Sequence, residues 1–333
     1  MRRASRAFVY HVPGEQDCCP ACGASQIFDL DVLPLRRSID GCRTGFVSGC
    51  EDCGLVFRNP VLTAEDLKQF YSPDGGWGAP GAAPLERKER SSRSWSRAFQ
   101  PIRSELSVTR PPAGACVLDF GCGRGRLLDS LQEFGWQTWG IDSAIDEAFS
   151  RHRRLDEVPD VPMFDLIVAS HVLEHVTDPL GLLRQLARAC RVGGFLFVGA
   201  PRLDTLPIHR DYGYVINGRA HVSAFTWPCL QGLLARSGWE SVAPPPDRIS
   251  KGGGRHTYAR LRVLAKRVET GVEPFELPAA SARAAIRTYQ ATLERPLFER
   301  LRLFRLAART TESHRRRTLR DRKSKKHVES PLT

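Results

Sequence analysis

The sequence predicts an α/β fold with a Rossmann-like, doubly wound and mostly parallel sheet, preceded by a small cysteine-rich module and followed by a basic helical tail. Three observations predict it. Strand-like and helix-like segments alternate over residues 113–267. A glycine-rich turn joins the first of these strands to a helix, and two C-x-x-C pairs lie near the N-terminus.

The expected strands are short apolar runs separated by segments with helical spacing. In one such segment, residues 181–191, Leu182, Leu183, Leu186 and Cys190 recur on one face. The last two strands are expected to form an antiparallel hairpin at one edge. The expected strands are 116–120, 138–141, 164–169, 194–200, 240–243 and 261–266.

Four regions follow from these patterns. Residues 16–58 form the cysteine-rich module, and residues 59–112 form a helical linker that starts near Thr63, a plausible N-cap. Residues 113–267 form the α/β domain. Residues 268–333 read as a basic helical tail that is partly disordered.

The positive charge of the chain is concentrated in that tail. The net charge of all 333 residues is +12, and residues 281–333 carry 15 Lys/Arg against 5 Asp/Glu, a net of +10. Nucleic-acid binding is one interpretation of such a tail, and a solvated tail is the interpretation we favour. The sequence has no apolar run long enough for a membrane span and no apolar signal segment, so we expect a cytoplasmic protein without membrane contact.

The glycine-rich turn is VLDFGCGRG, residues 117–125, and the acid Asp142 ends the next strand. Glycines let the backbone approach a ligand closely, and an acid at the second strand can accept hydrogen bonds from ribose hydroxyls. A structural glycine turn is the alternative. A nicotinamide site is disfavoured because Arg126 stands where that fingerprint has glycine, and because Asp119 would repel a pyrophosphate.

VLDFGCGRG, GID (140–142), FDLIVASHVLEHVTDP (164–179) and GGFLFVGAP (193–201) together resemble the successive motifs of class I S-adenosylmethionine-dependent methyltransferases, type 11/23. The resemblance implies that Gly121, Cys122 and Gly123 lie beside the amino-acid end of that cofactor. It further implies a set of cofactor-binding side chains, in which Asp119 orients the ammonium, Asp142 and the adjoining Ser143 lie at the ribose, and Ser170 and His171 close over the cofactor.

The interval between Asp142 and Asp165 is short for this family, which usually has a helix and a full third strand there. Residues 154–158 are a candidate remnant of that strand. Asp156 is then either an adenine contact or a solvated acid, and we favour the second interpretation.

The cysteine pairs are Cys19/Cys22 and Cys50/Cys53, each followed by glycine. Four thiolates at this spacing suit a structural Zn²⁺ in a zinc ribbon, without an open position for a catalytic water. A redox pair and incidental cysteines are the alternatives. We expect Cys18 and Cys42 not to be ligands, although either could substitute for one of the four.

The ribbon, the motif CGLVFRNP (53–60) and the later segment GRAHVSAFT (218–226) resemble zinc-ribbon methyltransferases, including sugar C-methyltransferases. The resemblance implies an active-site cover in residues 59–112 and catalytic roles for Tyr71 and His221. Ala220 stands where the sugar enzymes have Glu, and we expect no counterpart of their large C-terminal domain in this sequence. His175 is a further catalytic candidate, or a structural residue at a helix start.

Three functions are compatible with these residues. The first is a methyltransferase acting on a small-molecule biosynthetic intermediate, sugar or natural-product-like, with His221 as general base. The second is an RNA or protein methyltransferase that docks through the ribbon and tail. The third is a cofactor-binding module without turnover. O-, N- and C-methylation, and any oligomeric state, are all compatible with the sequence.

Overall fold

The computed structural model describes residues 17–34, 44–59, 65, 111–142, 151–203, 221–242 and 260–269. They all belong to residues 1–289, one of two compact units into which the chain divides; the other is 290–333. Tyr71, Ser143, Cys42, the basic tail after residue 269 and nearly all of the 59–112 linker lie outside the described residues. In the part of the chain that is described, no helix is long and apolar enough to cross a membrane.

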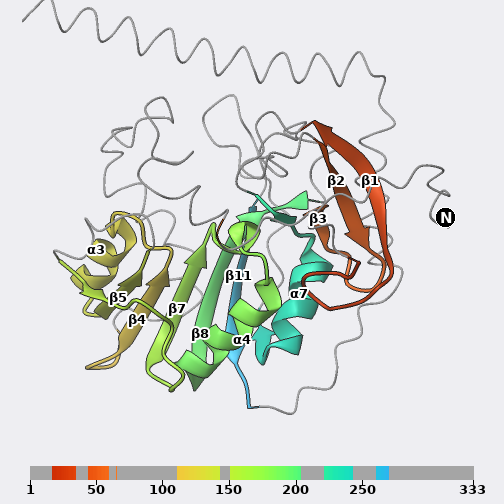
Figure 1. The fold of residues 1–333 in the computed structure, drawn as a ribbon. Helices are drawn as coiled ribbons and strands as arrows, with labels where there is room; N and C mark the ends of the chain where they lie inside the picture. Colours follow the sequence, from red (N-terminus) through yellow and green to blue (C-terminus); the bar gives the residue numbers. More distant parts are fainter. Residues whose placement is uncertain are drawn as a thin grey trace, which may run out of the picture. The chain divides into compact units, whose positions relative to one another are not determined.

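A seven-stranded sheet forms the centre of the α/β domain, in the order β10-β11-β8-β7-β4-β5-β6 (Figure 1). Strands β8, β7, β4, β5 and β6 are parallel to one another, whereas β11 runs antiparallel to both β8 and β10. The predicted mostly parallel sheet and its final antiparallel hairpin are confirmed. The strands are β4 (Cys116–Phe120), β5 (Gln137–Ile141), β6 (Arg153–Arg154), β7 (Phe164–Ser170), β8 (Cys190–Pro201), β10 (Trp239–Ser241) and β11 (Arg260–Arg267).

Alternating side chains of these strands fill two hydrophobic cores, one on each face of the sheet, because successive strand residues point to opposite faces. Leu118 and Ile167 belong to one core, while their neighbours Val117 and Leu166 belong to the other. Both faces are buried, as expected for a parallel sheet covered by helices.

Three α-helices of the described residues cover the sheet. Helix α3 (Arg126–Glu133) packs its leucines into the core that contains Val117. Helices α4 (Pro179–Ala189) and α7 (Trp227–Arg236) lie side by side over the opposite face (Figure 1). Each begins with a proline in its first turn and a capping side chain: Asp178 accepts from the Gly181 amide, and Thr226 accepts from the Cys229 amide.

A second sheet contains the cysteine-rich module. Its order is β1 (Ile27–Pro34), β2 (Thr44–Cys50), β3 (Val56–Asn59) and β9 (Ser223–Ala224), and all its pairs are antiparallel. Strand β9 comes from the α/β domain, between β8 and α7 in the chain. The module therefore shares a sheet with the domain that follows it.

The strand after β5 is reduced to two residues, Arg153 and Arg154, which pair in parallel with Trp139 and Gly140. This agrees with a strand remnant in the short interval after Asp142. The side chain of Asp156 is 83% exposed and forms an ion pair with Arg154 at 3.0 Å, as a solvated acid would.

Candidate functional site

The glycine loop follows β4 and turns into α3. Gly121, Gly123 and Gly125 all have positive φ angles, of 79°, 53° and 73°, where side chains other than glycine are strained. The Gly121 and Cys122 amides both donate to the carbonyl of Ile141, at 2.8 and 3.1 Å. A Cβ on Gly121 would lie 2.7 Å from Cγ2 of Val172. The loop is therefore pressed between the end of β5 and the segment that follows β7.

Two carboxylates lie at the ends of the adjacent strands β4 and β5. Asp119 is buried, and this burial, together with the negative charge of Asp142, raises its pKa to about 7. The Oδ2 atom of Asp142 accepts a hydrogen bond of 2.8 Å from the Gly123 amide. A buried carboxylate is costly unless a cation pairs with it, so a positively charged ligand group beside Asp119 would be stabilised.

The side chain of Cys122 lies in the core beneath α3 and is 8% exposed. Burial, followed by the charge of Asp119, raises the pKa of its thiol to about 12. Cys122 is thus an uncharged thiol at neutral pH, and its backbone is the part available to a ligand.

At the end of β7, His171 has a φ of 59°, the one positive value for a residue other than glycine among the described residues. Its amide donates to the Gly199 carbonyl at 2.7 Å, and its Nδ1 lies 2.9 Å from Oε1 of Glu174. Such backbone geometry costs about 1–3 kcal/mol and is often found at functional sites. Ser170 and His171 lie at the same edge of the sheet as the glycine loop.

A short 3₁₀ turn, η2 (Leu173–His175), follows and places a carboxylate between histidines. Glu174 is completely buried. Burial acts to raise its pKa, but the hydrogen bond and charge of His171, and the charge of His175, outweigh it and hold the pKa below its usual range. The ring centroids of His175 and His221 lie 4.7 Å apart, and the rings meet edge to face with an interplanar angle of 74°.

The second sheet holds the segment that carries His221. The Val222 amide donates to the Glu174 carbonyl at 2.7 Å, while the Arg58 amide donates to the Val222 carbonyl at 2.9 Å. Strand β9 then pairs with β3. The segment that carries His221 is thus hydrogen-bonded to η2 on one side and to the cysteine-rich module on the other. These bonds bring the two predicted histidines, His175 and His221, together.

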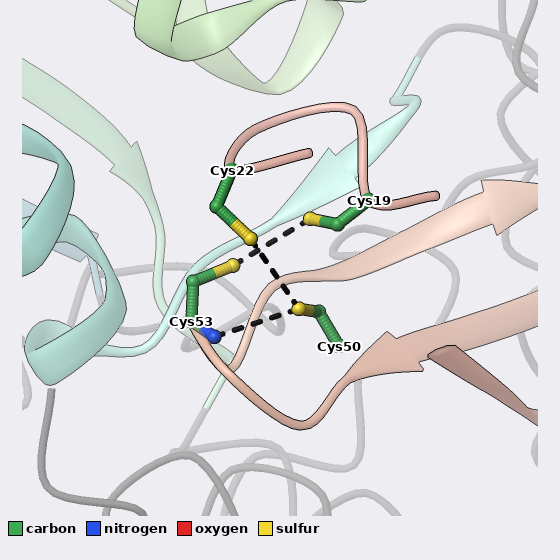
Figure 2. A group of neighbouring side chains, drawn as sticks. All are labelled: Cys19, Cys22, Cys50 and Cys53. Carbon is green, nitrogen blue, oxygen red and sulfur yellow. Dashed lines mark hydrogen bonds between the residues drawn. The ribbon is translucent and has the colours of Figure 1, made fainter. Parts of the chain in front are cut away.

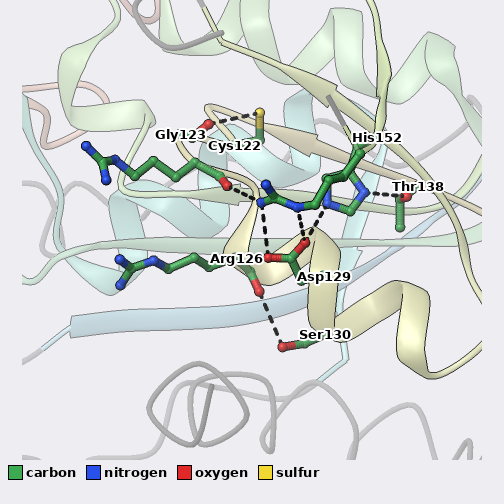
Figure 3. Close-up of polar contacts among 9 residues, drawn as sticks. Cys122, Gly123, Arg126, Asp129, Ser130, Thr138 and His152 are labelled. Atoms are coloured by element: carbon green, nitrogen blue, oxygen red, sulfur yellow. Dashed lines mark hydrogen bonds and ion pairs between the residues drawn. The ribbon is translucent and has the colours of Figure 1, made fainter. Parts of the chain in front are cut away.

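A polar network beside the glycine loop was not predicted from the sequence (Figure 3). Asp129 of α3 accepts hydrogen bonds from Arg151 Nε and lies 2.9 Å from Nε2 of the buried His152. His152 Nδ1 lies 3.0 Å from Thr138 Oγ1 on β5, and Arg151 also donates to the Arg124 carbonyl in the loop. These contacts lower the pKa of Asp129 against the effect of its partial burial. No motif marks these residues, because their partners are distant in sequence.

The four predicted metal ligands lie together at one end of the second sheet, with their sulfur atoms turned toward one another (Figure 2). The Sγ atoms of Cys19 and Cys53, and those of Cys22 and Cys50, are 3.6 Å apart. This is too far for a disulfide, whereas Zn–S bonds of about 2.3 Å in a tetrahedron separate sulfurs by about 3.8 Å. Cys18 is exposed, outside the cluster. The four thiols fit a structural Zn²⁺.

The comparisons with known proteins agree with this geometry. Residues 90–243 match the family model for the methyltransferase domain. This match, together with the glycine loop that follows β4, supports a class I S-adenosylmethionine-dependent methyltransferase fold for that part of the chain.

Among curated proteins, the chain is 34% identical over 118 residues to the ubiquinone biosynthesis O-methyltransferase of Xanthomonas axonopodis pv. citri, a match that covers 30% of this chain and 49% of the relative. The enzyme of the same name from Xanthomonas oryzae pv. oryzae is 33% identical over the same shares. The chain thus spans about half the length of the curated relatives it matches.

Two similar solved structures are also methyltransferases. The Burkholderia thailandensis 1,6-didemethyltoxoflavin-N1-methyltransferase is 19% identical with a TM-score of 0.42, over 56% of this chain and 82% of its own. The magnesium protoporphyrin IX methyltransferase of Synechocystis is 18% identical with a TM-score of 0.40, over 53% and 83%.

Proposed function

We propose that the chain is an S-adenosylmethionine-dependent methyltransferase acting on a small-molecule biosynthetic intermediate, sugar or natural-product-like. The observation that carries the proposal is that His175 and His221, whose rings are in contact, lie close to the glycine loop. Val172 meets Gly121 on one side, and its carbonyl accepts the His175 amide at 2.8 Å on the other. A methyl donor held by the loop would therefore lie close to a potential base.

The cofactor's positive charge supports the assignment of its binding residues. Asp119 would pair with the ammonium, and Asp142 would face the ribose, with the backbone of Gly121–Gly123 between them. Ser143, Ser170 and His171 complete the proposed set. The burial of Asp119 supports a cationic partner. Ionising a buried carboxyl group is unfavourable, and a positive group beside it would offset that cost.

His221 is the proposed general base, with His175 beside it and Tyr71 as a further candidate. His221 would take the proton from an acceptor hydroxyl while the acceptor oxygen bonds to the methyl carbon. The sulfur–methyl bond breaks, S-adenosylhomocysteine leaves, and His221 then releases the proton to water. The names of the curated relatives, which are O-methyltransferases, support a hydroxyl acceptor.

The four cysteines would hold a structural Zn²⁺, since their spacing and burial suit a closed tetrahedral site. This ion would keep the second sheet ordered. Because β9 belongs to that sheet, the ion also supports the position of His221.

Mass spectrometry of the purified chain tests the proposal. We expect bound S-adenosylhomocysteine, and labelled methyl transfer to members of a panel of phenols, sugars and nucleotide sugars. Cofactor binding without transfer to any small molecule, RNA or protein would indicate a binding module. Transfer to RNA alone would indicate the nucleic-acid function instead.

A further inference from the structure

The carboxylate of Glu174 has two differently placed oxygens. Oε1 lies 2.9 Å from Nδ1 of His171 and 3.9 Å from Nε2 of His175. Oε2 is buried and has no hydrogen-bond partner among the described residues. Burying a carboxylate oxygen without a hydrogen-bond partner is energetically unfavourable, so this arrangement requires a reason.

The ligand atoms of Glu174, His175 and His221 all lie within 4.8 Å of one another. Glu174 and His175 come from η2, while His221 is brought in by the segment that β3 holds. The two histidines are partly exposed and the carboxylate is not. Solvent therefore contacts the cluster at the two imidazoles and not at the carboxylate.

We propose that Glu174, His175 and His221 form a binding site for a divalent transition-metal ion, distinct from the four-cysteine site. Two imidazoles and one carboxylate suit Zn²⁺, Fe²⁺, Mn²⁺ or Co²⁺, whereas Mg²⁺ and Ca²⁺ prefer sites built wholly of oxygen. Oε2 of Glu174, which has no hydrogen-bond partner among the described residues, would coordinate the ion. His171, bonded to Oε1, would orient the carboxylate as metal-bound carboxylates are oriented by a hydrogen-bonding neighbour.

Three protein ligands leave coordination positions open for a small molecule. An acceptor with a hydroxyl or adjacent oxygens would coordinate there, and the ion would lower the pKa of that hydroxyl. Its proton would pass to water. This consequence rests on the proposed function. In the metal-loaded chain the ion would perform the task that His221 performs alone in the metal-free chain.

Cobalt binding to the full chain tests the site without measuring activity. Metals are removed under reducing conditions, and Co²⁺ is returned while its absorption and total content are measured. We expect one equivalent with thiolate-to-cobalt charge-transfer absorption, from the cysteines. A second equivalent should add only the weak bands of nitrogen and oxygen ligands.

Glu174→Gln and His221→Ala should each weaken the second equivalent by at least about tenfold and leave the thiolate absorption unchanged. The matched control for the carboxylate is Glu240→Gln, an exposed side chain on β10, which should bind both equivalents. His221→Ala removes a partly exposed ring, so it keeps the test valid if Glu174→Gln fails to fold.

The proposal would be overturned if the unaltered chain bound only one equivalent of Co²⁺, the one with thiolate absorption. A second equivalent that both variants retain would also overturn it. The outcome is separable from that of the proposed function: S-adenosylhomocysteine binding without a second metal removes only the metal site, and a second metal without cofactor binding removes only the methyltransferase proposal.

Discussion

The rings of His175 and His221 meet edge to face, with their centroids 4.7 Å apart, although the two residues are distant in sequence. His175 ends a turn after β7, and His221 lies two residues before β9, which pairs with β3 of the cysteine-rich module. The site that we propose for the acceptor therefore depends on both sheets.

Replacing His221 by Asn should lower kcat by about 10²–10⁴-fold, the usual contribution of a general base, once an acceptor is known. The affinity for S-adenosylhomocysteine should change little, since the cofactor loop is built from other elements. Calorimetry and steady-state kinetics on the same preparation separate the two effects. An unchanged kcat would remove His221 from the chemistry.

Gly121→Ala should abolish cofactor binding. The new methyl group would lie 2.7 Å from Val172 Cγ2, on a backbone whose φ is 79°. Gly193→Ala is the control, because Gly193 has a φ of 82° and nothing within 4 Å of an added Cβ. Both variants share the backbone strain, so loss of binding in the first alone would be due to the loop. Thermal unfolding monitors folding in both.

Cofactor binding should strengthen as pH rises towards 7 and then level off. In the ligand-free chain the pKa of Asp119 is about 7, above its usual value of 3.8. Protonated Asp119 therefore contributes to the free energy of unfolding of the ligand-free chain. This contribution is fully present below about pH 4 and is lost as pH rises through 7. A cation beside Asp119 favours the ionised form, so binding at pH 6 should release a proton.

Calorimetry of S-adenosylhomocysteine binding in buffers of different ionisation enthalpy counts that proton. Asp119→Asn should bind weakly at every pH and show no proton release. It should also unfold at a higher temperature than the unaltered ligand-free chain at pH 8, since it removes a buried charge. Proton release that persists in the variant would place the titrating group elsewhere.

Asp129→Ala should weaken cofactor binding although Asp129 is not among the proposed cofactor contacts. The change removes the Asp129 partner of Nε2 of the buried His152, at a cost of about 1–3 kcal/mol, and breaks the ion pair that joins Arg151 to α3. Asp160→Ala is the control, because it breaks an exposed ion pair with Arg188, a pair worth at most about 1 kcal/mol. Equal effects of the two variants on affinity would contradict a role for the network.

Removing the metal from the four cysteines should destabilise the second sheet and reduce methyl transfer. Cys53→Ser should lower both the unfolding temperature and the zinc content, because a thiolate ligand is lost. Cys18→Ser changes an exposed thiol outside the cluster and should alter neither. Elemental analysis and calorimetric scans report the result. Full zinc content in Cys53→Ser would exclude the tetrahedral site.

Local patterns predicted much of the fold. The strands β4, β5, β7, β8, β10 and β11 were expected from apolar runs, and the structure places each within a few residues of its predicted range. The four clustered cysteines were expected from their spacing. Such features depend on side-chain periodicity and backbone geometry over a few residues, which a sequence displays directly.

Pairings between distant segments were not predictable. The sequence gives no sign that β9 joins the second sheet, that Glu174 is buried with one oxygen unpartnered, or that Arg151 and His152 converge on Asp129. These contacts have no shared period or motif, because they depend on the order of strands and on which loops the two sheets bring together.

The sequence by itself thus determined the class of domain, the glycine loop with Asp119 and Asp142, and the four cysteines, since each is a local pattern. The tertiary structure alone decided how His221 reaches His175 and Glu174. That meeting requires β3 and η2 to hold the same segment, and hydrogen bonds between segments so far apart in the chain exist only once both sheets have formed.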